Sequence, residues 1–251
     1  MPMRPSRKKH IALLSAIVTT LVLCLFFFAA GFRSSSARQE KERLKDRPPI
    51  PDLPVVDYEL SEHPGAVSTS SRRERDSRYD NRDWVREDAN VSIAAIAGHW
   101  GLKMSSLPVG ESDDVVLGRV IQAQAHLSRD KTGIYSEFTF EIESVYKEGS
   151  SSSLYAGRTI AIAREGGAVR FPSGRIQRYI VAHQGMPRVG ERYVLFLKNA
   201  QGESFDILTG YELRNNKVQA LDSLNTFAAY NQVAESEFLD ALRDALKHVN
   251  Q

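Results

Sequence analysis

The segment Glu165–Tyr179, EGGAVRFPSGRIQRY, combines glycines with arginines, as loops that bind phosphate do. A Walker loop is a glycine-rich string that ends in Gly-Lys-Ser/Thr, and the chain has no such string. In a dinucleotide-binding loop the glycines open a helix, whereas Gly166 and Gly167 are followed by residues with strand character. Pro172 and Gly174 suit the second and fourth positions of a type I turn. We therefore predict a β-hairpin with a basic edge.

The basic residues of this region are the candidate binding residues. From Arg158 to Lys198 there are eight basic and two acidic side chains, an excess of +6 in a chain of net charge +2. This pattern favours an anionic partner, such as a headgroup, an acidic glycan or an acidic protein surface, although a solvated sheet face has the same pattern. Aromatic residues are too few among the arginines for nucleic acid, which argues against that partner. The candidates are Arg164, Arg170, Arg175, Arg178, Tyr179 and His183.

No motif groups residues for catalysis. The chain has neither the Gly-x-Ser-x-Gly nor the His-Glu-x-x-His pattern. Cys24 is its single cysteine, so no intrachain disulfide or multi-thiolate metal site can form. We predict no catalytic residue, metal or cofactor. A hydrolase stays open as an alternative if His126 or His183 meets a carboxylate, with Asp113, Asp114 and Glu165 as candidates.

Short strands must position these residues. Residues 135–146 show the clearest alternation, with Phe138, Phe140 and Ile142 on one face and Glu137, Thr139, Glu141 and Glu143 on the other, which indicates a half-buried strand. The run Tyr193–Leu197 is apolar throughout, so we expect cover on both faces. Further strands are expected at 115–125, 159–163, 168–171, 176–181, 205–208 and 218–221, and a short helix or strand within 91–107.

These strands predict a mainly β domain over residues 91–225, because no helix separates them and Gly and Pro mark the joints. We expect a small antiparallel β-barrel of the OB-like kind, or a sandwich. A C-terminal amphipathic helix is expected within 226–251. Its apolar stripe is Phe238, Leu239, Leu242, Leu246 and Val249.

Residues 33–90 differ from the domain in composition. They are rich in Pro and Ser, have few aliphatic residues and mix their charges closely, as in the run Arg72–Asp76. Such a segment buries too little apolar surface to offset its ordering entropy. We therefore predict a disordered, solvated tether. Interleaved acids also argue against a polyanion-binding arm here.

Residues 11–32 form an uncharged run of 22 residues. As a helix this run would reach about 33 Å, which matches a bilayer core of about 30 Å. It is longer than the apolar part of a cleaved signal peptide, and the residue before Cys24 is not the small one of a lipoprotein signal. We predict an uncleaved transmembrane signal-anchor, with cleavage kept as the alternative. The basic residues of the tail 1–10 favour a cytoplasmic N-terminus and an exported C-terminal part.

A resemblance to a family rests on several stretches of the sequence, among them His99-Trp100-Gly101, VVLGRV, KTGIYSEFTFEIESVYK, GERYVLFL and ILTGYEL. Over roughly residues 99–222 the chain resembles uncharacterised bacterial exported and membrane-anchored proteins with a small β domain. Its strand plan is also similar to OB-like or netrin-like barrels, without the cysteines of netrin modules. The resemblance implies no activity and no catalytic residue. We expect a membrane-tethered binding or assembly module of the bacterial envelope, with an envelope hydrolase as the alternative.

Overall fold

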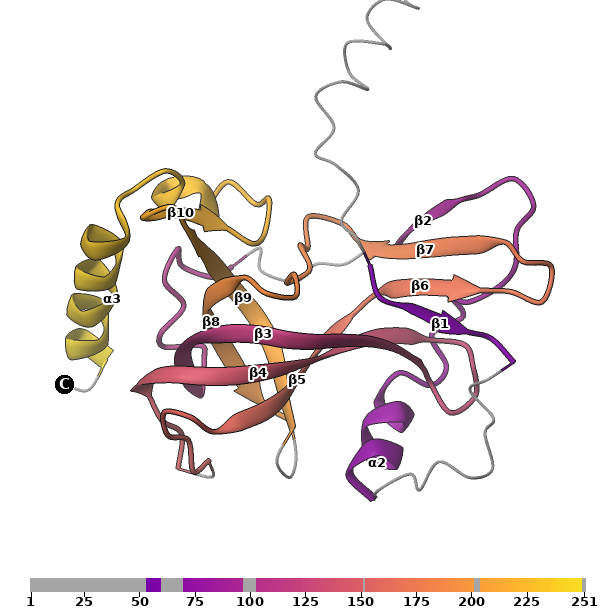
Figure 1. The fold of residues 1–251 in the computed structure, drawn as a ribbon, viewed down its shortest axis with the longest axis horizontal. Coiled ribbons are helices and arrows are strands. Elements are labelled where there is room, and N and C mark those ends of the chain that lie inside the picture. The colour runs from indigo at the N-terminus through magenta and orange to yellow at the C-terminus, as the bar shows by residue number, and fades with distance from the viewer. Residues whose placement is uncertain (1–52, 60–69, 97–102, 151, 201–203, 250–251) are drawn as a thin grey trace, which may run out of the picture. The chain divides into compact units, whose positions relative to one another are not determined.

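The described part of the chain is mainly β-structure with a C-terminal helix, as predicted. The computed structural model describes residues 53–59, 70–96, 103–150, 152–200 and 204–249, all in the second of the chain's two units, Pro51–Gln251. Their strands form a six-stranded and a four-stranded sheet (Figure 1). The predicted span 11–32 lies outside these residues. Among the described residues no helix has the length and apolar character needed to cross a membrane.

The six-stranded sheet contains the two longest strands and carries most of the core. Its order is β10-β9-β5-β4-β3-β8, and β9 also pairs with β8. Parallel pairing between β5 and β9 is limited to the three positions from Ala161–Ser204 to Ala163–Asp206, so the sheet is not a closed barrel. The strands are β3 (Asp114–Leu127), β4 (Ile134–Lys147), β5 (Thr159–Glu165), β8 (Arg192–Asn199), β9 (Ser204–Arg214) and β10 (Lys217–Ala220).

Both faces of this sheet are covered in its centre. Tyr193–Leu197 of β8 are fully buried, which confirms the prediction for this run. Alternate residues enter two different cores. Leu195 packs with Phe138 and Phe140 of β4, and Phe196 packs on the opposite face. The predicted alternation in β4 is confirmed, since Phe138, Phe140 and Ile142 are buried there.

Helix α3 (Glu235–Val249) covers the second of these faces, as its apolar stripe predicts. Phe238 and Leu242 are fully buried against a cluster that includes Phe196 and Tyr211. Each such side chain contributes about 2 kcal/mol by leaving water. The short 3-10 helix η2 (Phe227–Tyr230) precedes α3 and buries Phe227, and α3 itself begins at Glu235, within the expected range 226–251.

The four-stranded sheet contains the predicted hairpin. Its order is β1-β6-β7-β2, and β6 (Gly167–Arg170) and β7 (Ile176–Val181) are antiparallel. The Phe171 carbonyl accepts from Gly174 N at 2.8 Å, and Gly174 has a φ of +81°. This is a type I turn followed by a left-handed glycine, which confirms the turn. The outer strands β1 (Val55–Asp57) and β2 (Ile93–Ile96) each run parallel to their neighbour.

The prediction of a disordered tether over 33–90 is wrong for residues 53–59 and 70–90. They include β1 and helix α2 (Ser70–Arg78), which packs beside β4. Tyr79 stacks on Tyr135 of β4 with 4.5 Å between ring centroids, and the Arg75 guanidinium is buried in an ion pair with Glu137. The mixed charges that indicate a solvated segment therefore have partners on the strands. The rest of the tether lies outside the described residues.

Candidate functional site

Arg164, the first of the predicted binding residues, is part of the core. Its side chain is almost fully buried, and Nη2 lies 2.8 Å from Asp222 Oδ2. Nη1 donates to the Gly185 carbonyl at 2.6 Å, and Nη2 also donates to the Leu208 carbonyl at 3.1 Å. These contacts connect β5 with β9 and with the loop after β7. The main contacts of this guanidinium are therefore structural.

Arg170, Arg175 and Arg178 are on the hairpin of the smaller sheet. By register, Arg170 pairs with Ile176 and Arg178 pairs with Ala168, so Arg170 and Arg178 lie on the same sheet face. The exposed Arg170 forms an ion pair with Asp57 of β1 at 2.9 Å. Arg175 follows the turn and donates to the Asp88 carbonyl at 3.1 Å. Two of the three predicted arginines therefore share a face that β1 partly neutralises.

Tyr179 and His183 do not join that face. Tyr179 is fully buried, and its hydroxyl donates to the Arg86 carbonyl at 3.1 Å. Tyr179, although one of the candidate binding residues, therefore belongs to the core. His183 is exposed in the loop after β7, with Nδ1 3.3 Å from Ser223 Oγ. The six predicted residues thus do not form one site.

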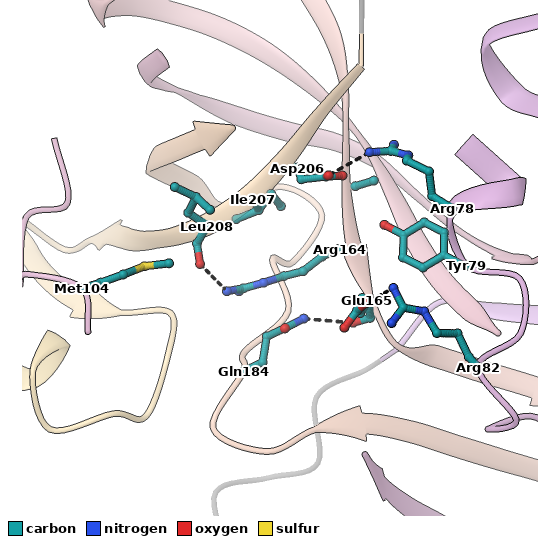
Figure 2. A pocket seen from close by; sticks show the side chains of 11 residues that line it. Arg78, Tyr79, Arg82, Met104, Arg164, Glu165, Gln184, Asp206, Ile207 and Leu208 are labelled. Carbon is teal, nitrogen blue, oxygen red and sulfur yellow. Dashed lines mark hydrogen bonds and ion pairs between the residues drawn. The ribbon is translucent and has the colours of Figure 1, made fainter. Parts of the chain in front are cut away.

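A different site lies where β5 and β9 separate (Figure 2). It is a cleft of about 310 Å³. Ile207, Leu208, Ala163 and Met104 supply its apolar surface. Its polar lining is Arg78, Tyr79, Arg82, Arg164, Glu165, Gln184 and Asp206.

The cleft exists because strand pairing stops before the strands end. The last β5–β9 pair is Ala163–Asp206, so backbone groups beyond it need other partners. Arg164 supplies one by donating to the Leu208 carbonyl. Gln184 supplies another by donating Nε2 to the Glu165 carbonyl at 2.9 Å. Side chains thus satisfy both carbonyls, and the open seam is stable without a further strand.

Helix α2 and the residues after it form the third wall. Arg78 Nη1 lies 2.8 Å from Asp206 Oδ2 of β9, and Arg82 Nη2 lies 3.2 Å from Glu165 Oε1 of β5. Tyr79 lies between these arginines in the chain and also lines the cleft (Figure 2). Two ion pairs therefore join the segment 78–82 to the two strands that separate.

The two carboxyl groups are held in a partly dehydrated place. Burial raises the pKa of Asp206, and the neighbouring Arg78 only partly opposes this shift. Burial likewise raises the pKa of Glu165, against the influence of Arg82 and with a contribution from Asp206. Both carboxylates can therefore gain from a further hydrogen-bond donor.

The two histidines that the hydrolase alternative names, His126 and His183, lie among the described residues. His126 is buried, and its Nδ1 lies 2.9 Å from Arg72 Nη2. Burial and the charges of Arg72 and Arg75 lower the pKa of His126 to about 4. Neither His126 nor His183 contacts a carboxylate among the described residues, and these residues contain no cluster suited to a metal ion.

Comparison with known proteins does not assign the chain to a family. No family model matches the chain, and a search of curated proteins finds no match.

Sequence reasoning missed most of the cleft. Arg78, Tyr79 and Arg82 lie in the segment that the sequence predicts to be a tether, and Asp206 lies in a predicted strand with no role in a site. One signal was available, since Tyr79 and Trp84 are large aromatic residues in a segment that is otherwise charged. Such residues stabilise by burying their rings and so indicate docking to a folded surface.

Proposed function

We propose that this protein is a membrane-tethered binding module, exported to the bacterial envelope, whose ligand site is the cleft between β5 and β9. The observation that carries the proposal is the cleft itself, with a partly buried, charged lining next to an apolar surface. Ligand sites commonly combine such a surface with a few convergent polar groups.

We further infer an OB-like strand plan for the larger sheet. The pairings run from β3 to β4, β5, β9 and β8 and return to β3. This circular order, with a short parallel β5–β9 seam, supports a partly open five-stranded barrel of that kind. A fold of this type accommodates many functions, so the proposed function depends on the cleft and not on the strand plan.

The membrane part of the proposal depends on the sequence of residues 11–32. Mass spectrometry of the full chain purified from membranes should find these residues on the mature protein, and added protease should reach the domain only from the exported side. An N-terminus near Arg38, or a domain degraded only from the cytoplasmic side, would contradict the anchor or its orientation.

The envelope hydrolase is the weaker alternative. It would need an acid–base pair in the cleft, and the titratable side chains that line it are Glu165, Asp206, Tyr79 and three arginines. All three arginines are in ion pairs with carboxylates. This arrangement supports binding better than proton transfer.

The full chain, labelled with ¹⁵N in detergent micelles, should be titrated with a library of small polar compounds of every charge class. We expect at least one compound to shift amide signals of residues 163–165 and 206–208. A Met104→Trp variant, which narrows the cleft, should lose this response. A Val189→Trp variant, at an exposed site that does not line the cleft, should keep it. If no compound shifts these signals, the cleft is not a ligand site.

A further inference from the structure

Two polar atoms of the cleft have no hydrogen-bond partner among the described residues. Asp206 Oδ1 is buried and accepts no hydrogen bond, although Oδ2 of the same carboxylate binds Arg78. The Tyr79 side chain is 5% exposed, and none of the described residues hydrogen-bonds its hydroxyl. Figure 2 shows this hydroxyl on the side of the ring nearer to Asp206. Buried polar groups in proteins are almost always satisfied, so Asp206 Oδ1 indicates a ligand. The Tyr79 hydroxyl is a second polar group that the cleft offers to that ligand.

The two atoms have different requirements. Asp206 Oδ1 is a carboxylate oxygen and needs a donor. A protonated amine suits it best, because charge-assisted hydrogen bonds are the stronger ones. The Tyr79 hydroxyl can donate, and a ligand carboxylate would accept. The site thus offers one position for a cation and one for an anion.

The surrounding charges favour a ligand that carries both signs. Arg78 and Arg82 face Asp206 and Glu165, and the third arginine of the lining faces Asp222. A simple anion would have to draw an arginine away from its carboxylate. A simple cation would be repelled by three arginines. A zwitterion supplies both signs, so its ammonium meets the open oxygen of Asp206 while its carboxylate meets the nitrogens of Arg82 that are not paired with Glu165.

The dimensions agree with a small molecule of this class. A volume of about 310 Å³ is at the lower end for ligand pockets. Ile207, Leu208 and Met104 provide a surface for a short aliphatic side chain. The Arg82 side chain is 40% exposed, so it can turn toward a ligand from the rim.

We propose that the cleft binds small amino-acid-type zwitterions, with the ammonium on Asp206 and the carboxylate on Arg82 and Tyr79. This inference rests on the proposed function, because it names the ligand class of the same site. Free amino acids and short peptides share the two charged groups, but a peptide separates them. A cleft at the lower end of the size range of ligand pockets favours the smaller of the two, the free amino acid.

The test is a set of calorimetric and amide-shift titrations of the full chain in micelles. The probes are alanine, N-acetylalanine, alaninamide and dialanine. We expect alanine to bind, and the two probes that each lack one charge to bind about tenfold more weakly or worse. Dialanine should also be weaker. If dialanine binds more tightly than alanine, a peptide terminus is the ligand and the free amino acid is excluded.

Two variants assign the contacts. Asp206→Asn keeps the shape of the side chain and removes the charge that the ammonium needs, so alanine binding should fall about tenfold or more. Tyr79→Phe keeps the stacked ring and removes only the hydroxyl, so binding should fall several-fold even if the first variant folds poorly. Asp244→Asn, on the exposed face of α3, is the matched control and should bind as the wild type does.

The outcomes separate this inference from the proposed function. If alaninamide or N-acetylalanine binds as tightly as alanine, or if Tyr79→Phe has no effect, the zwitterion is wrong. If a compound of another charge class shifts the cleft signals and alanine does not, the inference fails while the ligand site stands. If no compound shifts those signals, both fail.

Discussion

Arg164 Nη2 and Asp222 Oδ2 lie 2.8 Å apart, and the two side chains are 2% and 0% exposed. The carboxylate also accepts from Thr209 Oγ1 at 2.7 Å and from Gly185 N at 2.8 Å. Because Arg164 bonds the Leu208 carbonyl as well, this pair connects the strands on both sides of the cleft.

Replacing Asp222 by Ala should destabilise the protein by about 3–5 kcal/mol, because Arg164 would stay buried without its counter-charge. The free energy of unfolding is measured by urea denaturation of the full chain in micelles. The double variant Arg164→Met/Asp222→Leu removes both charges and should lose less than Asp222→Ala alone. The pair does not stabilise the seam between β5 and β9 if the single and double variants lose the same free energy of unfolding. The same conclusion follows if Asp222→Ala costs under about 1 kcal/mol.

Docking of α2 should protect its arginines from trypsin. Arg75 is buried and Tyr79 packs on Tyr135, so brief digestion of the folded chain should spare the bonds after Arg75 and Arg78. Tyr79→Ala removes a buried aromatic ring at a cost of about 3 kcal/mol and should expose both bonds. Tyr155→Ala, at a site 61% exposed, is the control. Rapid cleavage at Arg75 in the wild type would show that α2 is not docked.

His126 should make stability depend on pH in the acid range. Its pKa is lowered from 6.5 to about 4 by burial and by Arg72 and Arg75, so the unfolded chain binds the proton more readily. Its contribution is complete above about pH 6.5 and is lost as the pH falls toward 4. Over this pH interval the free energy of unfolding of the wild type should fall by up to about 3 kcal/mol more than that of His126→Gln.

Denaturant unfolding curves at a series of pH values check this difference between variant and wild type. Comparison of the two cancels the titration of Asp76, whose pKa is raised by burial in the same cluster. His248→Gln, at an exposed position on α3, controls for the loss of one histidine. If the free energy of unfolding changes with pH by the same amount in the wild type and in His126→Gln, His126 is not the titrating group.

The basic hairpin gives a separate prediction, since Arg170 and Arg178 share one of its faces and Arg175 follows its turn. Reversing Arg170, Arg175 and Arg178 to Glu should weaken binding to anionic vesicles, and wild-type binding should fall as salt screens the charges over about 10 Å at 0.1 M. Stability should change by only about 0.5–1 kcal/mol per site, since Arg170 and Arg175 are exposed and Arg178 is half-buried.

The matched control for this face reverses three basic residues elsewhere, Arg129, Arg243 and Lys247, whose side chains are all mostly exposed. It changes the net charge by the same amount and should retain binding. Co-sedimentation with anionic vesicles measures the binding of both triple variants. If the two triple variants bind vesicles equally, or if binding does not change with salt concentration, the basic hairpin has no specific anionic partner.

Local patterns in the sequence determined most of the strands, the turn and the terminal helix. The alternation around Phe138 and Phe140 marks a half-buried strand wherever it occurs, since successive side chains point to opposite faces. Pro172 and Gly174 specify their turn through their own backbone preferences. The stripe from Phe238 to Leu246 requires a covering surface, although it does not say which.

Only the tertiary structure decided which charges are buried. Arg164 and Arg170 have similar surroundings in the sequence, yet one is paired inside the fold with Asp222 and the other at the surface with Asp57. The cleft depends on the separation of β5 from β9 and on a segment that begins far earlier in the chain. Contacts between such distant residues are set by packing of the whole domain, because the sequence pattern within a segment does not specify which distant segment it will contact.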